Sequence, residues 1–335
     1  MFIFIDESGT FTHGAGATAI CLVGALVLPE GNAPKIQSKY QGIRASLPKE
    51  NGEVKGRLLT ESQVDRVVMM LSKNDALFEV VGIDMSAHTA QGVQAHKSGQ
   101  EQGMTANITA DFHPNVQQGA WDLRRRLEAM PRQLYVQSVA TFELIAITIE
   151  HATIYFSQRQ PKALEYFHWV IDAKDRGRVT DWESWWSFTV MPMTQSRYLR
   201  RPIGQFVEGD YSFFARFDTE IPEHLRPHLS NPQERTGLDA RKLLTESFRF
   251  SDQSEPGLEM VDILTNATRR ALTGRLAIEG WRNIPRLMIH RRQHYVNLIS
   301  LEHVAASHPF PYGNVLRHFS RGGKSMLAPR FNSRP

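Results

Sequence analysis

The sequence predicts an α/β protein, a mixed β-sheet flanked by helices. Short apolar runs rich in β-branched and aromatic residues have the length and composition of buried strands, at residues 2–5, 18–28, 77–85, 164–172 and 243–250. Between them, apolar residues recur at helical spacing, most clearly at residues 60–71, 121–157 and 258–276. Strands that alternate with helices are typical of the α/β class.

The first two strands are predicted to form a hairpin. Residues 9–17 between them are rich in Gly and Thr, which favours a turn. Pro29 ends the second strand, and Pro34 suits the first turn of a helix over residues 33–47. Residues 51–56, Asn-Gly-Glu-Val-Lys-Gly, then form a polar turn bracketed by two glycines.

Composition excludes several classes of protein. Hydrophobic residues make up 41% of the chain and charged residues 22%, as in soluble globular proteins. The single cysteine, Cys21, excludes an intramolecular disulfide framework and a Cys-rich zinc module. No secretory signal is visible, and the apolar runs at 20–28 and 139–149 are too short for a membrane span. We therefore expect a cytoplasmic protein that has no contact with membranes.

Positive charge is concentrated near the C-terminus. Residues 269–335 carry 12 Lys and Arg but only two Asp and Glu, whereas the whole chain has a net charge of +4. An acidic body with a basic C-terminal region suits a polyanionic partner such as nucleic acid. A solvated basic surface is the alternative interpretation.

Acidic residues lie where apolar segments meet polar connections. Asp6 ends the first strand, Asp172 ends the strand at 164–172, and Asp262 lies one turn into the last predicted helix. Glu53 in the Gly-bracketed turn is a fourth candidate. An aspartate within apolar sequence is costly to bury unless it is paired or metal-bound. Carboxylates are the ligands that Mg²⁺ and Mn²⁺ prefer, and such ions catalyse phosphodiester hydrolysis.

Three segments resemble the DUF3800 family, in the order in which that family has them. They are Asp6-Glu7-Ser8-Gly9 after the first strand, the Glu53-x-Lys55 element, and Ser251-Asp252-Gln253-Ser254 followed by a helix with Glu259 and Asp262. The resemblance implies an RNase H-like fold and a divalent-metal nuclease centre. It also suggests a role in defence, such as phage defence. Glu259 is a departure, since the family commonly has Gln there.

Domain boundaries follow from the resemblance and from composition. We expect an RNase H-like catalytic domain over residues 1–280 and a basic C-terminal extension over 281–335. Residues 86–118 are polar and suggest a mobile insertion. Residues 173–240, rich in Pro, Trp and Arg, suggest a second, irregular insertion. Pro131 is expected to begin a new helix within the helical segment.

The resemblance points to Asp6, Glu53 and Asp262 as metal ligands and catalytic residues, and the strand-end argument adds Asp172. For each, a turn, capping or ion-pair role is the alternative. Five further residues are candidates for supporting roles around the metal: Glu7, Ser8, Lys55, Asp252 and Glu259. Glu7 is expected to face away from Asp6, because neighbours on a strand point to opposite faces. Lys55 is a candidate contact to the scissile phosphate.

Other groups were weighed for binding. The pairs Arg200-Arg201 and Arg291-Arg292 are candidate phosphate contacts. The aromatic cluster of residues 182–188 is expected to fill a core or a subunit or partner interface, with stacking on unpaired bases as the alternative. Three histidines lie in the polar insertion and are expected to be mobile rather than metal-bound: His88, His96 and His113.

The predicted function is metal-dependent hydrolysis of RNA or DNA. The absence of a P-loop and of a Gly-x-Gly-x-x-Gly pattern disfavours ATP hydrolysis and dinucleotide chemistry. Two alternatives remain at this stage. One is a non-catalytic nucleic-acid-binding or regulatory protein with the same fold, and the other is a nucleotide phosphohydrolase.

Overall fold

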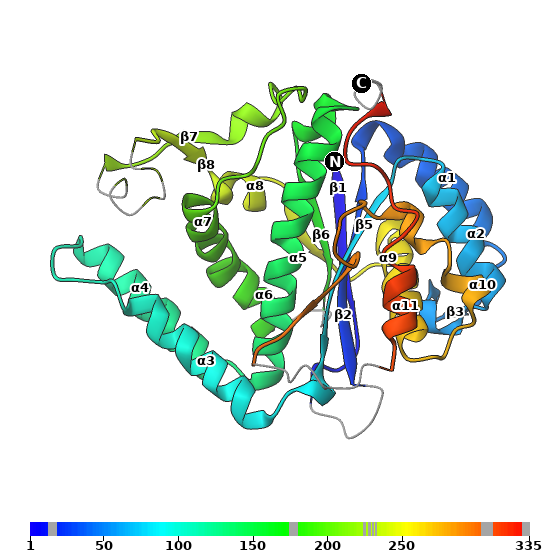
Figure 1. Ribbon diagram of the computed structural model, residues 1–335, viewed down its shortest axis with the longest axis horizontal. Coiled ribbons are helices and arrows are strands. Elements are labelled where there is room, and N and C mark those ends of the chain that lie inside the picture. The colour runs from blue at the N-terminus through cyan, green and yellow to red at the C-terminus, as the bar shows by residue number, and fades with distance from the viewer. Residues whose placement is uncertain are drawn as a thin grey trace.

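A computed structural model describes residues 1–12, 19–173, 180–223, 226, 229, 231, 233–302 and 311–329. Its centre is a six-stranded mixed sheet in the order β10-β5-β2-β1-β6-β9 (Figure 1). The strands are β1 (Phe2–Ser8), β2 (Ile20–Leu28), β5 (Leu77–Asp84), β6 (His168–Asp172), β9 (Phe248–Ser251) and β10 (Val296–Ile299). Strand β2 runs antiparallel to both neighbours, and every other pair in the sheet is parallel.

Helices cover both faces of this sheet (Figure 1). Helix α5 (Arg132–Ser157) packs on β2 and β5 from one side. Helix α9 (Pro256–Leu272) packs on β1 and β2 from the other, with α1 (Ala33–Arg44) and α2 (Glu61–Ser72) beside it. Alternate residues of β1 enter the two cores, because side chains of a strand alternate between faces. Ile3 and Ile5 belong to the core under α5, and Phe4 belongs to the core under α9.

Helix α9 approaches the sheet closely. A Cβ atom at Gly257 would lie 2.2 Å from the ring of Phe4, so a side chain at this position would push the helix away from β1. The helix is amphipathic, and its buried face includes Val261 and Leu264. This close packing places the side chains of α9 directly over the strand ends.

Most predicted elements of the sheet and its helices are confirmed. The β1–β2 hairpin, α1, α2, β5 and α9 lie where the apolar patterns predicted them. Thr60 caps α2 in a capping box with Gln63, and Pro131 immediately precedes α5, which begins at Arg132. The strand predicted over 243–250 was wrong in its first half, because residues Ala240–Thr245 form α8 and only β9 is extended. Asp239 caps α8 by accepting a hydrogen bond from the Lys242 backbone N–H.

The prediction of mobile and irregular insertions was wrong. Residues 86–118 contribute α3 (Ala90–Thr105) and the start of α4 (Pro114–Ala129), which pack together as a helical hairpin at the lower left of Figure 1. Thr89 caps α3, and Pro114 begins α4. The second region contains α6 (Asp181–Trp185), a π-helical turn (Trp186–Val190), α7 (Met191–Arg200), and a small sheet of β7 (Asp218–Glu220) and β8 (Thr236–Leu238).

The C-terminal region is built into the same fold. Strand β10 forms one edge of the main sheet, and Tyr295 and Phe319 belong to the core under α9. Helices α10 (Ile278–Trp281) and α11 (Gly313–His318) pack near α2 and α9. The boundary expected near residue 280 therefore falls inside a continuous structure rather than before a separate extension.

Helix α5 is longer than the apolar run at 139–149 suggested. By length and composition alone it could cross a membrane, but 61% of its most apolar stretch is buried inside the protein. A helix packed on β2 and β5 in this way is equally what a soluble core requires. It therefore carries no conclusion about a membrane.

Candidate active site

Two aspartates lie side by side near the carboxyl ends of two central parallel strands: Asp172 ends β6, whereas β1 continues beyond Asp6 to Ser8. Strands β1 and β6 are paired up to Ile5 and Ile171, so the next residues, Asp6 and Asp172, stand at the same level. Both share the face of Phe4, which is covered by α9. The sequence placed these residues at strand ends, and the parallel register brings them together.

Helix α9 adds Asp262 from above the same strand ends. Its Oδ2 atom accepts a hydrogen bond from the backbone N–H of Gly56 over 2.7 Å. A Cβ atom at position 56 would lie 2.8 Å from the Cα of Ile263 and 2.9 Å from the carbonyl oxygen of Asp262. The turn can approach the helix this closely because residue 56 has no side chain.

The same turn supplies Glu53 and Lys55. A short hairpin of β3 (Lys49–Glu50) and β4 (Glu53–Val54) presents them toward α9. The Nζ atom of Lys55 lies 2.6 Å from a carboxylate oxygen of Glu53, and its side chain is 39% exposed. The ammonium group also acts on Asp172 and Asp262, whose pKa values it lowers, and remains accessible to solvent.

All four predicted ligands line one narrow cavity of about 30 Å³. Its polar lining consists of Asp6, Glu53, Lys55, Asp172, Gln253, Ser254, Glu255, Glu259 and Asp262. Residues far apart in the sequence therefore meet at a single point.

The electrostatics of this cavity are those of crowded, buried carboxylates. Burial raises the pKa of Asp172 to about 6; Lys55 opposes this shift, whereas the charges of Glu53 and Asp262 add to it. Burial likewise raises the pKa of Asp262, against the lowering effect of the Gly56 N–H and of Lys55. Burial lowers the pKa of Lys55, but its hydrogen bond to Glu53 and the surrounding negative charges outweigh this effect and raise it. The carboxylates of the cavity outnumber the positive groups that lie beside them.

Glu259 has a different role from its acidic neighbours. Its carboxylate is buried, with 4% exposed, and accepts hydrogen bonds from the Arg44 guanidinium at 2.7 Å on each oxygen. It accepts three more, from the Tyr40 hydroxyl, the Val54 backbone N–H and the Ser254 hydroxyl. Burial raises the pKa of Glu259, but these donors outweigh it and lower the pKa. Glu259 therefore clamps α1, the β4 turn and the Ser254 loop onto α9.

The donor set fits a hard divalent cation in its chemistry, though not yet in its arrangement. Of the six acidic residues that line the cavity, Glu259 is paired with Arg44, Glu255 with Arg249 and Glu53 with Lys55. Burial instead raises the pKa of Asp172 and of Asp262, because it disfavours their charged forms. Within the described part of the chain, no three His, Cys, Asp or Glu side chains are close enough to hold one ion as they stand. A shared ion would require their side chains to rotate inward.

Of the other residues predicted to support the metal site, some lie near Asp6 and α9 and others do not. Glu7 is in register with Val23, whose side chain lies in the core under α5, so Glu7 is on the face away from Asp6, as expected. Ser8 is buried, and its hydroxyl lies 3.5 Å from the Asn266 side chain of α9. Asp252 is exposed and does not line the cavity.

The predicted phosphate contacts lie away from the cavity. Arg200 and Arg201 are at the end of α7, on the α5 side of the sheet. Arg291 donates hydrogen bonds to the backbone carbonyls of His294 and Tyr295. Together with Arg292 it precedes β10, which is separated from β1 by two strands, and neither arginine lines the cavity.

The histidines of the first insertion have separate structural contacts rather than a shared site. His88 is buried and hydrogen-bonds to Asp84 and Ser300. His96 hydrogen-bonds to Tyr135, and His113 caps α4. Only His96 lies within a helix; His88 and His113 precede α3 and α4, and the expectation that the three are mobile stays a prediction.

The aromatic cluster at 182–188 is mostly core. Trp182, Trp185 and Trp186 are buried under α5, as the sequence suggested, whereas Phe188 is 51% exposed. Sequence reasoning missed Tyr40, Arg44 and the backbone of Gly56 as parts of the site. Tyr40 and Arg44 lie one turn apart on α1, a signal too common to single them out.

Comparison of the chain with models of protein families, with curated proteins and with solved structures found no match.

Proposed function

We propose that the protein is a divalent-metal-dependent nuclease that hydrolyses phosphodiester bonds at the cavity lined by Asp6, Glu53, Asp172 and Asp262. One observation carries the proposal. Carboxylates from β1, β4, β6 and α9 converge on one cavity, where burial raises the pKa of Asp172 to about 6. Perturbed carboxylates that meet in a cleft favour a functional site over a structural one.

The proposal is consistent with the fold that the DUF3800 resemblance implies. We infer an RNase H-like sheet, in which central strands carry carboxylates at their ends. Support comes from the mixed topology, in which the β1–β2–β5 meander is extended by parallel β6 and β9. It also comes from Asp6 and Asp172 on adjacent strands, with the third aspartate on a covering helix.

Mg²⁺ or Mn²⁺ would be held by Asp6, Asp172 and Asp262, with Glu53 at the rim. When bound, the ion would supply Lewis acidity and neutralise charge at the phosphodiester. The chain itself contributes two further elements. Lys55 offers an exposed ammonium to a phosphate oxygen, and Glu259 fixes the turn that carries Lys55 and Glu53.

Labelled RNA and DNA oligonucleotides, incubated with a titration of Mn²⁺ and of Mg²⁺, test this function. The wild type should cleave at least one of them, and Asp6→Asn and Asp262→Asn should lower the rate by about 100-fold or more. Asp210→Asn, an exposed aspartate outside the cavity, is the matched control and should cleave as the wild type does. Cleavage that persists in both Asp6→Asn and Asp262→Asn would remove the assignment. Turnover of mononucleotides without cleavage of oligonucleotides would favour a nucleotide phosphohydrolase instead. Metal-independent binding of nucleic acid without turnover would favour a regulatory protein.

A further inference from the structure

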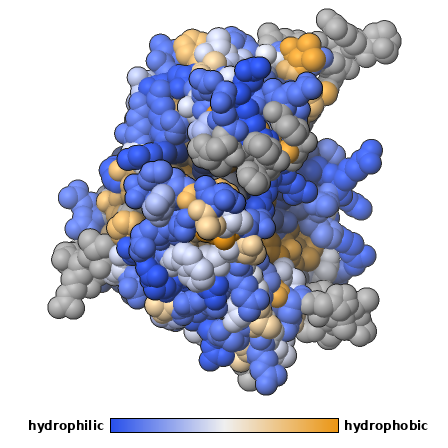
Figure 2. Space-filling model, turned by 90° about the vertical axis from the view of Figure 1, so that its left-hand side faces the viewer, coloured by the Kyte–Doolittle hydropathy of each residue, from blue (hydrophilic) through white to orange (hydrophobic). Residues whose placement is uncertain are grey.

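A groove lies on the opposite side of the sheet from the carboxylates, between the α3–α4 hairpin and α6. It consists of two neighbouring cavities of about 190 and 210 Å³, which share Trp185 and Thr189 in their linings. Figure 2 views the molecule from this side and shows a mainly hydrophilic surface interrupted by separate hydrophobic patches. The groove therefore combines an apolar floor with polar surroundings.

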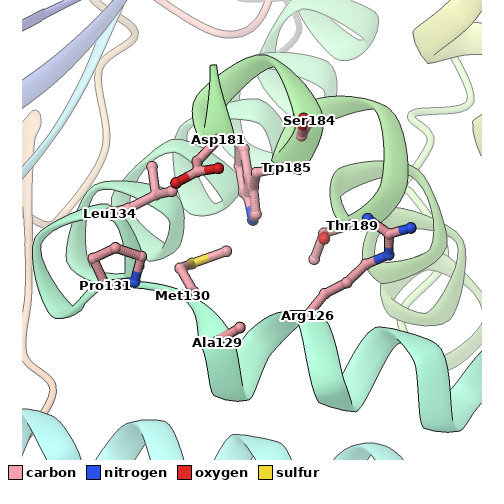
Figure 3. Close-up of a pocket in the computed structure, with 9 residues that line it drawn as sticks. All are labelled: Arg126, Ala129, Met130, Pro131, Leu134, Asp181, Ser184, Trp185 and Thr189. Atoms are coloured by element: carbon pink, nitrogen blue, oxygen red, sulfur yellow. The ribbon is translucent and has the colours of Figure 1, made fainter. Parts of the chain in front are cut away.

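The lining of the first cavity suits a planar ring that has polar groups at its edge (Figure 3). The Trp185 indole forms one wall, and Met130 and Pro131 lie across the opening from it. Polar groups stand around this apolar centre, with Asp181 on one side and Arg126 and Thr189 on the other (Figure 3). A nucleobase has an apolar face for stacking and hydrogen-bonding groups at its edge, so both kinds of surface would be matched.

Two exposed aromatic rings, on α4 and on the π-helical turn, each lie beside an arginine; of these residues, only Arg126 lines one of the cavities. Phe188 is 51% exposed, and the guanidinium carbon of Arg126 lies 4.2 Å from its ring centroid. Trp121 is 44% exposed, and the corresponding carbon of Arg124 lies 5.1 Å from its ring. Among the described residues, no carboxylate forms an ion pair with Arg126. Phe188 belongs to a π-helical turn, a rare conformation that is frequent at functional sites.

We propose that this groove binds single-stranded nucleic acid, with one base against the exposed ring of Phe188, beside the buried Trp185, and a phosphate near Arg126. The inference rests on the proposed function and names its substrate class. Exposed aromatic rings alternating with guanidinium groups bind unpaired bases and backbone together. A duplex keeps its bases stacked on one another, so these rings would contribute little to binding it.

The groove and the carboxylate cavity are connected through β6. Asp172 ends this strand at the cavity, and Asp181 begins α6 at the groove nine residues later. Nine residues span at most about 30 Å. One strand of several nucleotides could therefore cross the sheet edge and reach both places.

Fluorescence anisotropy with a labelled 20-nucleotide single strand, in EDTA and at low salt, tests the proposal independently of catalysis. Phe188→Ala and Arg126→Ala should each weaken binding by about tenfold or more. Arg126→Ala should also reduce the salt dependence of binding by about one charge. Ile278→Ala and Arg275→Ala are matched controls, since both residues are exposed and lie beyond α9. They should bind as the wild type does, and an unlabelled duplex should compete poorly.

Binding by Phe188→Ala and Arg126→Ala that equals the wild type would overturn the proposal. So would a fall in molecular mass of Phe188→Ala in light scattering, because the ring would then serve an interface between two copies. Asp6→Asn separates this proposal from the nuclease assignment, since it removes a proposed metal ligand and leaves every residue of the groove in place. If the groove variants bind and cleave normally while Asp6→Asn is inactive, only the groove proposal fails. If the wild type binds through the groove but never cleaves, only the nuclease assignment fails.

Discussion

The backbone N–H of Gly56 donates a 2.7 Å hydrogen bond to the carboxylate of Asp262, and this contact joins the β4 turn to α9. The turn carries Glu53 and Lys55, and the helix carries Asp262, so one contact sets the spacing of three charged side chains. The approach leaves 2.8 Å between a Cβ at position 56 and the Cα of Ile263. The acidic cluster thus depends on a position that contributes a backbone N–H but no side chain to it.

Gly56→Ala should therefore damage the site without removing any functional group. The added methyl group must displace the turn from α9, which typically costs about 1–3 kcal/mol of unfolding free energy. We expect cleavage to fall by about tenfold or more, measured at a temperature where the variant is folded by circular dichroism. Gly42→Ala on α1 is the control, since a Cβ there meets no atom within 4 Å and should stabilise the helix by up to about 1 kcal/mol. Full activity in Gly56→Ala would show that the turn does not position the cluster.

Asp172→Asn should make the metal-free protein more stable at neutral pH. Burial raises the pKa of Asp172 to about 6, so between about pH 4 and 6 the folded state binds more protons than the unfolded state. The unfolding free energy of the wild type therefore falls as the pH rises through this window, and the loss is complete above it. We expect Asp172→Asn to gain roughly 1–3 kcal/mol at pH 7.5 by urea denaturation in EDTA.

That gain should shrink toward zero near pH 4, where the wild-type carboxyl is also protonated. Saturating Mn²⁺ should reverse the order of the two proteins at pH 7.5, because the ion stabilises only the form that binds it. A constant difference across the pH range would mean that Asp172 titrates normally. If Asp172 serves function rather than stability, the Asp172→Asn variant should be more stable and should lose cleavage.

The strand ends and α9 were predictable because their signals are local. A short apolar run that ends in Asp6 or Asp172, and an amphipathic helix that contains Asp262, can be recognised from residue spacing alone. Their convergence depends on the parallel register of β1 and β6 and on the packing of α9 against the sheet. Neither property is encoded in a single segment. The sequence therefore predicted that these carboxylates would meet only on the assumption of an RNase H-like fold.

The two insertions were mispredicted for a different reason. Polar, Gly-rich sequence at 86–118 has little helical periodicity, yet α3 and α4 are stabilised by packing on each other and by caps at Thr89 and His113. Tertiary contact overrode weak local propensity. The basic C-terminal segment is likewise not a separate extension, because Arg291 donates hydrogen bonds within the fold and β10 completes the sheet. Net charge of a segment does not reveal where its side chains point.

Glu259→Gln should be strongly destabilising, although the same residue type is common at this position in the family that the sequence resembles. The substitution leaves the Arg44 guanidinium without its charged partner and replaces one acceptor oxygen by a donor facing Tyr40 or Val54. We expect a loss of about 2–4 kcal/mol in urea denaturation. Glu255→Gln is the matched control, because its partner Arg249 is 52% exposed and such pairs contribute about 0–1 kcal/mol. Equal effects of the two substitutions would contradict the clamp.

Lys55→Met should separate metal binding from turnover. The ammonium of Lys55 lies 2.6 Å from Glu53 and opposes the charges of Asp172 and Asp262, so it competes with any cation at the cavity. Its removal should tighten Mn²⁺ binding by about 5- to 50-fold in isothermal titration calorimetry without nucleic acid. Cleavage should nevertheless fall by about tenfold or more, since the phosphate loses a positive contact. Lys49→Met, at an exposed lysine of β3, should change neither quantity. Weaker Mn²⁺ binding in Lys55→Met would mean that Lys55 supports the ligands rather than competing with the ion.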